Sequence, residues 1–233
     1  MSLVECVPNF SEGKDRTKID RIVEAIGRVP GVKVMDVDPG PDTNRTVVTI
    51  VGSPEGISEA AFQGIKRASE LIDMSNHSGA HPRMGATDVC PFIPINGVTI
   101  EECIELSKKV GRRVGDELGI PVFLYEYSAQ RSDRKDLSNI RKGEYEGLAD
   151  KLRQPEWRPD YGPSELNIHA GATAIGCREF LIAYNINLNS KDHRLAMDIA
   201  FELREAGRAA REPNPASRNI LDGSIIRFKD DAY

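Results

Sequence analysis

The sequence is poor in the features that mark secreted and membrane proteins. Its four cysteines are widely spaced and form no C-x-x-C pair, which argues against both a zinc site and a disulfide framework. The longest apolar stretches, such as "PVFLY" from Pro121, are strand-sized, whereas a membrane-spanning helix needs roughly 20 apolar residues. The N-terminus lacks the basic region, apolar core and cleavage site of a signal peptide. We therefore expect a cytoplasmic protein without membrane contact.

The sequence also lacks a dominant cluster of cations, and its net charge is -5. Nucleic acid is held by clustered Lys and Arg, so we expect no nucleic-acid partner. There is no P-loop, no G-x-G-x-x-G after a strand, no G-x-S-x-G and no H-E-x-x-H. What is present, 39% apolar and 29% charged residues over 233 positions, is typical of a globular protein with one or two domains.

Hydrophobic periodicity predicts six elements in residues 3–95. A helix is expected around Ile19, Ile22, Val23 and Ile26, and a second one begins with Ser53 as N-cap and Pro54 at the first helical position. Runs of β-branched and other apolar residues predict strands at Leu3–Val7, Val32–Asp38, Arg45–Gly52 and "TDVCPFIPI". The order β-α-β-β-α-β predicts an α+β fold, a ferredoxin-like sandwich with helices on one face of an antiparallel sheet.

The rest of the chain predicts an extension and a second unit. Thr99 and Glu102 form a capping box that starts another helix before the strand "PVFLYEY". Gln154–Gly176 is dense in Pro and Gly and predicts a long loop. A strand at Glu179–Leu188 and a helix carrying Leu195, Ile199 and Leu203 follow, and the composition turns polar after Gly207. We expect one subdomain over 1–176 and an incomplete second one over 177–233.

Two of the four histidines, His77 and His81, lie in one predicted loop between a helix and a strand. Because histidine titrates near neutral pH, either could shuttle protons, or both could be surface or capping residues. Their i, i+4 spacing would suit a metal only within a helix, and Gly79 and Pro82 disfavour a helix there. We therefore expect no metal site.

Other polar residues could assist such a histidine. Asp38 ends a predicted strand and could orient an imidazole, while Arg45 and Arg83 could bind carboxylates in bidentate fashion. Turn formation and a solvated surface are the alternatives. The "GPSELNIHAGATAIG" loop exposes many backbone N–H groups and could approach a flat ligand or an anion, unless it is a flexible linker.

Several segments together resemble one family. They are "LVECVPNFSEGKD", "DVDPGPDTNRTVVTIVG", "HSGAHPRMGATDVCPFIPI", "GEYEGL", "PDYGPS" and "GATAIGCREFLIAYNINL", and they run in order from Leu3 to about Gly207. The chain resembles glutamate formimidoyltransferase, the first catalytic part of formimidoyltransferase-cyclodeaminase. This resemblance implies two ferredoxin-like α/β subdomains with tetrahydrofolate bound between them, the second beginning near Cys177 and incomplete here.

The resemblance also implies site residues. The family's catalytic histidine falls on His81 and not on His77, and Asp38 would lie close enough to fix its tautomer. Because the substrates carry carboxylates, Arg45, Arg83 and Arg178 are the candidates to bind them. The folate-binding stretch falls on Gly162, Pro163, Ser164, Glu165, Leu166, Asn167, Ile168, His169, Ala170 and Gly171.

The implied reaction belongs to histidine degradation. It transfers the formimidoyl group of N-formimidoyl-L-glutamate to N5 of the co-substrate tetrahydrofolate, with His81 as base and then acid. A homodimer is the oligomer that the resemblance implies. Two alternatives stay open: a related transferase that uses N-formylglutamate, and a non-catalytic folate-binding or assembly module.

Overall fold

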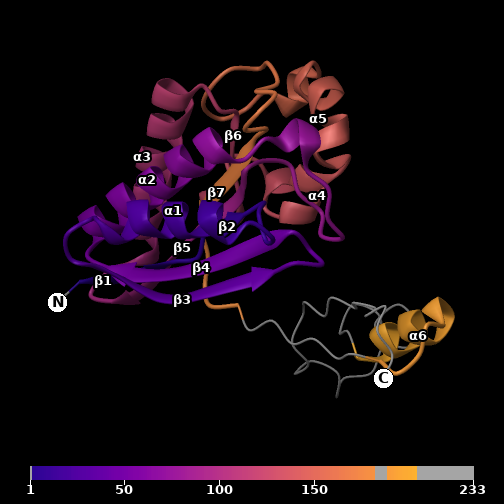
Figure 1. Cartoon of the computed structure of the whole chain (residues 1–233). Helices are drawn as coiled ribbons and strands as arrows, with labels where there is room; N and C mark the ends of the chain where they lie inside the picture. Colours follow the sequence, from indigo (N-terminus) through magenta and orange to yellow (C-terminus); the bar gives the residue numbers. More distant parts are fainter. Residues whose placement is uncertain (1, 182–187, 204–233) are drawn as a thin grey trace, which may run out of the picture. The chain divides into compact units, whose positions relative to one another are not determined.

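The computed structural model describes residues 2–181 and 188–203. The chain divides into two compact units, Met1–Glu179 and Phe180–Tyr233. The first unit contains the sheet and most of the described helices (Figure 1). No helix in the described part of the chain is long and apolar enough to cross a membrane.

A mixed sheet forms the centre of the first unit. Its strands are β1 (Leu3–Cys6), β2 (Asn9–Phe10), β3 (Val32–Gly40), β4 (Arg45–Gly52), β5 (Thr87–Asn96), β6 (Val122–Leu124) and β7 (Thr173–Cys177). β3 pairs antiparallel with β4, and β1 and β2 both lie antiparallel between β4 and β5. β7 then pairs parallel with β5, and β6 parallel with β7. The starts of β4, β5, β6 and β7 therefore lie at one edge of the sheet.

The described helices are α1 (Arg16–Gly27), α2 (Pro54–Leu71), α3 (Ile100–Leu118), α4 (Leu137–Arg141), α5 (Glu144–Leu152) and α6 (His193–Leu203). Short 3₁₀ helices cover Met74–Asn76, Glu126–Ser128, Ser132–Arg134 and Pro155–Trp157. The expected caps are confirmed: the Ser53 hydroxyl accepts from the Gly56 N–H at 3.2 Å, and Thr99 and Glu102 form a reciprocal capping box.

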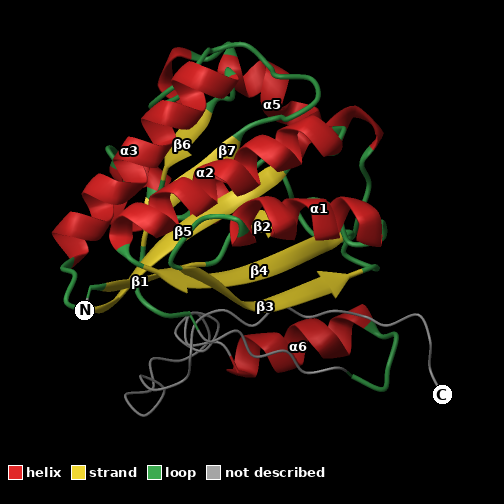
Figure 2. Cartoon of the chain, turned by 60° about the vertical axis from the view of Figure 1, so that its left-hand side comes forward, coloured by secondary structure: helices red, strands yellow, loops and turns green. Residues whose placement is uncertain are grey.

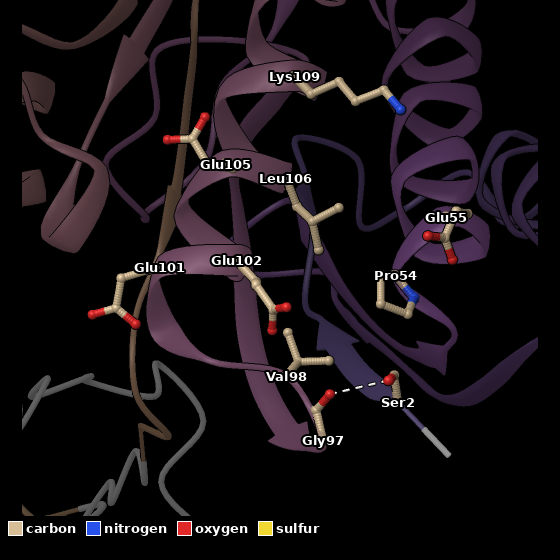
Figure 3. Close-up of a pocket in the computed structure, with 10 residues that line it drawn as sticks. All are labelled: Ser2, Pro54, Glu55, Gly97, Val98, Glu101, Glu102, Glu105, Leu106 and Lys109. Carbon is tan, nitrogen blue, oxygen red and sulfur yellow. Dashed lines mark hydrogen bonds between the residues drawn. The ribbon is translucent and has the colours of Figure 1, made fainter.

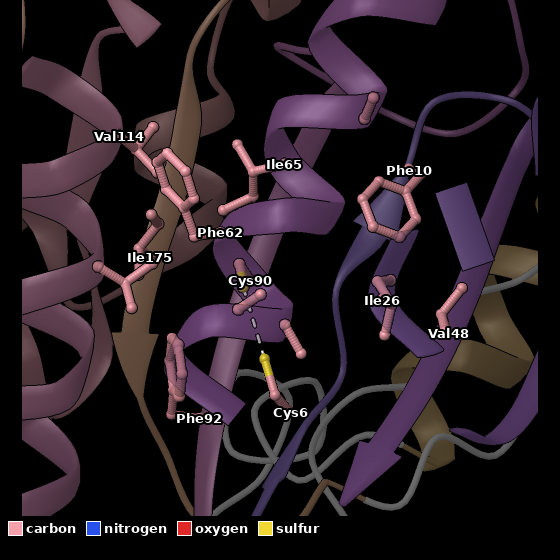
Figure 4. Close-up of a cluster of buried hydrophobic side chains, with 14 of the residues drawn as sticks. Cys6, Phe10, Ile26, Val48, Phe62, Ile65, Cys90, Phe92, Val114 and Ile175 are labelled. Atoms are coloured by element: carbon pink, nitrogen blue, oxygen red, sulfur yellow. Dashed lines mark hydrogen bonds between the residues drawn. The ribbon is translucent and has the colours of Figure 1, made fainter. Parts of the chain in front are cut away.

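Apolar side chains pack on both faces of the sheet. Figure 2 shows α1, α2 and α3 lying over one face, and the main core there includes Phe10, Phe62 and Phe92 (Figure 4). Successive side chains of a strand point to opposite faces, so Phe123 and Ala174 join a second cluster with residues of α4 and α5.

All four cysteines are free, buried thiols. The Cys6 and Cys90 sulfur atoms lie 3.5 Å apart between neighbouring strands (Figure 4). Burial and the Cys90 thiol raise the pKa of Cys6, so this thiol stays protonated and packs as a small apolar side chain.

The sequence predictions for the first unit are largely confirmed, and the fold is mixed α/β as expected for the α+β class. The order β1-α1-β3-β4-α2-β5 matches the predicted β-α-β-β-α-β series. The antiparallel pairing predicted for this series is present up to β5. Beyond it, β7 and β6 extend the sheet in parallel, and α4 and α5 cover the other face, so the sheet as a whole is mixed.

Two predicted element boundaries were wrong. The predicted loop Gln154–Gly176 ends earlier, because β7 begins at Thr173. Every residue of β7 is buried, and a strand buried on both faces shows no apolar and polar alternation to reveal it. The predicted strand "PVFLYEY" is strand only over Val122–Leu124, since Glu126 has a positive φ of 52° and begins a 3₁₀ helix.

In the second unit, the helix predicted around Leu195, Ile199 and Leu203 is confirmed as α6. The predicted strand Glu179–Leu188 falls mostly on residues 182–187, outside the described residues, and its described ends, Glu179–Leu181 and Leu188, are not strand. The polar segment after Gly207 also lies outside the described residues.

Candidate active site

His81 lies in the loop that leads into β5 and is buried, with 7% of its surface exposed. Its Nδ1 is 2.6 Å from the Pro82 carbonyl oxygen, and its Nε2 contacts Nη1 of Arg45. A carbonyl can only accept and a guanidinium can only donate. His81 is therefore the neutral tautomer that carries its proton on Nδ1, with its Nε2 lone pair directed at Arg45.

The environment lowers the pKa of His81 from its ordinary 6.5 to about 4. Burial is the largest cause, followed by the positive charge of Arg45, and the Pro82 carbonyl acts in the opposite direction. Arg141 and Asp88 have smaller effects of opposite sign. The imidazole is therefore neutral at physiological pH and can act as a base.

His77 has a different role in the same loop. Its Nε2 donates to the Asn44 carbonyl at 2.9 Å, and its Nδ1 accepts from Nε of Arg83 at 3.3 Å. Burial lowers its pKa. Nε2 thus ties the loop to Asn44, and Nδ1 ties His77 to Arg83 within the loop, so the protein itself engages both ring nitrogens of His77.

Arg83 is buried and bound by carboxylates of α5. Its guanidinium lies 2.9 Å from Glu144 and 2.6 Å from Glu146, and Glu146 is the main cause of a raised pKa for Arg83. The same pairing lowers the pKa of Glu146 to about 2. Arg83 therefore lies beside His77, with its charge already neutralised by the protein.

The other two predicted arginines lie at opposite edges of the sheet. Arg45 is the first residue of β4 and contacts His81. Arg178 follows the last residue of β7, where its N–H donates to the Phe92 carbonyl at 3.0 Å. Because β5 and β7 run parallel and His81 precedes β5, the structure does not bring Arg178 to the histidine.

Asp38 lies on β3 opposite Val47 of β4, with an exposed side chain. The carboxylate that acts on the charge of His81 is instead Asp88, which is 1% exposed. Asp88 accepts from the Met84 N–H at 3.0 Å and from Nη2 of Arg141. Sequence reasoning missed Asp88, although a carboxylate within an apolar strand is itself a signal, since buried Asp residues need partners.

The predicted folate-binding loop is joined directly to the His81 loop. The Ala86 N–H donates to the Ala170 carbonyl at 2.8 Å, and the Ala172 N–H donates to the Met84 carbonyl at 3.0 Å. Glycine at 171 permits this approach: its φ is +65°, and a Cβ there would lie 2.2 Å from the Met84 carbonyl oxygen. The backbones of the two loops therefore form one continuous wall.

Asn167 shapes this loop internally. Its side-chain oxygen accepts from the Ala170 N–H at 2.9 Å, and its backbone carbonyl accepts from the Gly171 N–H at 2.7 Å. Ala170 and Gly171 are buried, Leu166 and Asn167 are half-buried, and the other predicted folate-binding residues are exposed: Gly162, Pro163, Ser164, Glu165, Ile168 and His169. The loop thus presents an accessible surface on a fixed base.

Among the described residues, neither a metal-binding cluster nor the groove in Figure 3 lies at this site. Within residues 2–181 and 188–203, no group of three or more His, Cys, Asp or Glu side chains could hold a metal ion. A groove of about 560 Å³ lies instead beside the first turns of α2 and α3 and the end of β5 (Figure 3). Pro54, Val98 and Leu106 are among its lining residues, and none of the predicted site residues is.

Comparisons with known proteins agree on one family. The formiminotransferase domain, N-terminal subdomain, matches residues 3–178. The chain is 53% identical over 214 residues to formimidoyltransferase-cyclodeaminase of Dictyostelium discoideum. This alignment covers 91% of this chain and 39% of that protein. It is 49% identical over 205 residues to glutamate formimidoyltransferase of Streptococcus pyogenes serotype M1, covering 88% and 69%.

A third relative, glutamate formimidoyltransferase of Thermoplasma acidophilum, is 50% identical over 206 residues, covering 88% of this chain and 68% of that protein. The chain spans about two fifths of the length of the formimidoyltransferase-cyclodeaminases that it matches. The matched family domain covers the sheet, the His81 loop and the 162–171 loop. The chain therefore belongs to the formiminotransferase family and contains its N-terminal subdomain.

Proposed function

We propose that this chain transfers the formimidoyl group of N-formimidoyl-L-glutamate to N5 of tetrahydrofolate, giving 5-formimidoyltetrahydrofolate and L-glutamate in histidine degradation. The observation that carries the proposal is the neutral, buried His81 at the junction with the 162–171 loop. Relatives named glutamate formimidoyltransferase, about 50% identical, support transfer of a formimidoyl group and the involvement of glutamate.

The reaction requires a proton to be removed and another to be delivered. N5 attacks the amidine carbon, and a C–N bond forms as the amidine π electrons move to its nitrogen. The attacking amine must then lose a proton, and the glutamate nitrogen must gain one. The C=N bond of the formimidoyl group then re-forms as the bond between its carbon and the glutamate nitrogen breaks. His81 supplies both steps, because its neutral Nε2 accepts the first proton and the resulting imidazolium donates the second.

The low pKa of His81, about 4, keeps the base unprotonated at neutral pH. General acid–base catalysis is most efficient when the pKa lies near the working pH, and loss of the Arg45 contact on substrate binding would raise the pKa of His81 in that direction. The hydrogen bond from Nδ1 to the Pro82 carbonyl, 2.6 Å, fixes the ring so that Nε2 is the reactive nitrogen.

Arg45 would link recognition of the substrate to this chemistry. Its guanidinium points at Nε2 of His81, and it suits a carboxylate of the dicarboxylate substrate better than a neutral ring. In this mechanism the bound carboxylate draws Arg45 away and leaves Nε2 open to the reacting nitrogen. Arg83 and Arg178 remain weaker candidates, the first because Glu144 and Glu146 already bind it.

The finer architecture belongs to the same proposal. The element order and the β5-β1-β4-β3 arrangement of strands support a ferredoxin-like first subdomain. We propose that a second such subdomain faces it, with the 162–171 loop as one wall of the folate site, and that the protein is a cytoplasmic homodimer. Asp38 stays a proposed partner of His81.

A transfer assay tests the function directly. The chain is incubated with N-formimidoyl-L-glutamate and tetrahydrofolate, and 5-formimidoyltetrahydrofolate is quantified by mass spectrometry, with N-formylglutamate as a parallel donor. His81→Ala should lower turnover about 10²- to 10⁴-fold, whereas His77→Gln should cost far less. Near-wild-type turnover of His81→Ala would overturn the role of His81, and transfer from the formyl donor alone would overturn the choice of substrate.

A further inference from the structure

The segment Gly143–Glu146 touches both loops of the candidate site. It comprises the N-cap and the first three residues of α5 and contains two consecutive residues with positive φ, Gly143 at 91° and Glu144 at 53°. A positive φ is unfavourable for glutamate, so tertiary contacts must hold it. Those contacts lead to the His81 loop on one side and to the 162–171 loop on the other.

Contacts with the His81 loop run through Arg83. The Tyr145 N–H donates to the Arg83 carbonyl at 3.0 Å. The neighbouring Glu144 and Glu146 carboxylates bind the Arg83 guanidinium at 2.9 and 2.6 Å. The segment Gly143–Glu146 therefore holds both the backbone and the side chain of Arg83. Arg83 is two residues from His81 in the sequence.

The contact with the 162–171 loop is a single side-chain bond. The Tyr145 hydroxyl donates to the Ile168 carbonyl at 2.7 Å, and the Tyr145 ring packs on the main core as a partly buried residue. Ile168 itself is 59% exposed, so its side chain does not anchor that part of the loop. The tyrosine hydroxyl therefore holds an exposed turn of the loop.

We propose that Tyr145 is a positioning residue that sets the 162–171 loop relative to His81. It acts through the Ile168 carbonyl and the Arg83 carbonyl and does not touch the reacting atoms. This inference rests on the proposed function, because it assigns the 162–171 loop to folate. Its consequence is that loss of the hydroxyl weakens folate binding more than it slows the chemical step.

Tyr145→Phe in the full chain isolates this contact, since the ring and the backbone N–H remain. We expect KM for tetrahydrofolate to rise roughly 2- to 10-fold, the worth of one neutral hydrogen bond, with kcat within twofold of wild type. Binding of 5-formyltetrahydrofolate, whose N5 cannot accept the group, should weaken by the same factor. Tyr127→Phe is the matched control, because Tyr127 is 45% exposed and lies in the 3₁₀ helix after β6.

Hydrogen exchange gives a measurement that does not depend on activity. Tyr145→Phe should speed exchange of the Ala170 and Gly171 amides and leave amides within β5 unchanged. Unchanged exchange in the 162–171 loop, or equal losses in kcat and in folate affinity, would overturn the inference. If the wild-type chain transfers no formimidoyl group, the proposed function fails, and the exchange comparison still decides whether Tyr145 positions the loop.

Discussion

Nη1 of Arg45 contacts Nε2 of His81, the only ring nitrogen of that histidine with a free lone pair in the Nδ1–H tautomer. A permanent cation at this position opposes protonation of the ring and is the second-largest cause of its lowered pKa, after burial. The protein therefore keeps the imidazole neutral, in the form that can accept a proton, at the start of β4 and β5 where the candidate site lies.

Removing this cation should shift the pH profile of the reaction. Because Arg45 lowers the pKa of His81 from 6.5 to about 4 together with burial, Arg45→Met should raise it part of the way back. Activity is lost as pH falls through the pKa of a base, so the acid limb of kcat/KM should move to higher pH. Arg67→Gln on α2 is the control, and an acid limb at the same pH in Arg45→Met and wild type would contradict the prediction.

A comparison of two exposed aspartates on β3 tests whether Asp38 acts on His81. If Asp38 fixes the tautomer of His81, Asp38→Asn should lower kcat well over tenfold without changing the fold. Asp36 is also exposed and lies two residues earlier on β3, so Asp36→Asn is a matched control. Equal turnover in both variants and wild type would remove Asp38 from the mechanism.

Asp88 and Arg141 should act as a pair in stability. Asp88 is 1% exposed, and the Arg141 side chain is 16% exposed. Asp88→Asn leaves the guanidinium without its counter-charge and should lower the free energy of unfolding by about 3 kcal/mol. Asp88→Asn with Arg141→Met should recover much of that loss, because no buried charge remains. Urea unfolding measures both, and additive losses in the double variant would show that the pair is not coupled.

Local chemistry predicted the elements of the first unit well where sequence and burial agree. The Ser53 and Thr99 caps and the β3–β4 pair follow from short-range preferences, and the structure has them. β7 was missed because burial on both faces removes the alternation that marks a strand. The parallel pairings of β7 with β5 and of β6 with β7 join segments far apart in the sequence, and local patterns do not predict such pairings.

The same distinction applies to the candidate site. The residue types and the loop composition offered both histidines and Arg45 as candidates, and the family resemblance selected His81 and the 162–171 loop. The structure brings His81, Arg45 and that loop together. Asp88, Arg141 and Tyr145 contribute through partners far away in sequence; Asp88 and Arg141, for example, are 53 positions apart. A periodicity or a motif carries no information on such contacts, so these residues required the fold.

Glycine at position 171 should be essential to the joined loops. Alanine there would place a Cβ 2.2 Å from the Met84 carbonyl oxygen, at a φ of +65° that L-residues rarely adopt. Either the loop must move away from Met84 or the backbone must flip, so Gly171→Ala should lower the free energy of unfolding by about 2 kcal/mol or more. Folate affinity should fall as well, because the loop surface shifts.

Gly147 provides the matched control for this substitution. It lies within α5, and a Cβ there meets nothing within 4 Å. Gly147→Ala should therefore raise the free energy of unfolding by up to about 1 kcal/mol, the helix propensity difference between the two residues. Urea unfolding and binding of 5-formyltetrahydrofolate should separate the two variants. Gly171→Ala should lower both the free energy of unfolding and the affinity, whereas Gly147→Ala should raise the free energy of unfolding and leave the affinity unchanged. Stability of Gly171→Ala equal to wild type would show that the close approach of the two loops is not required.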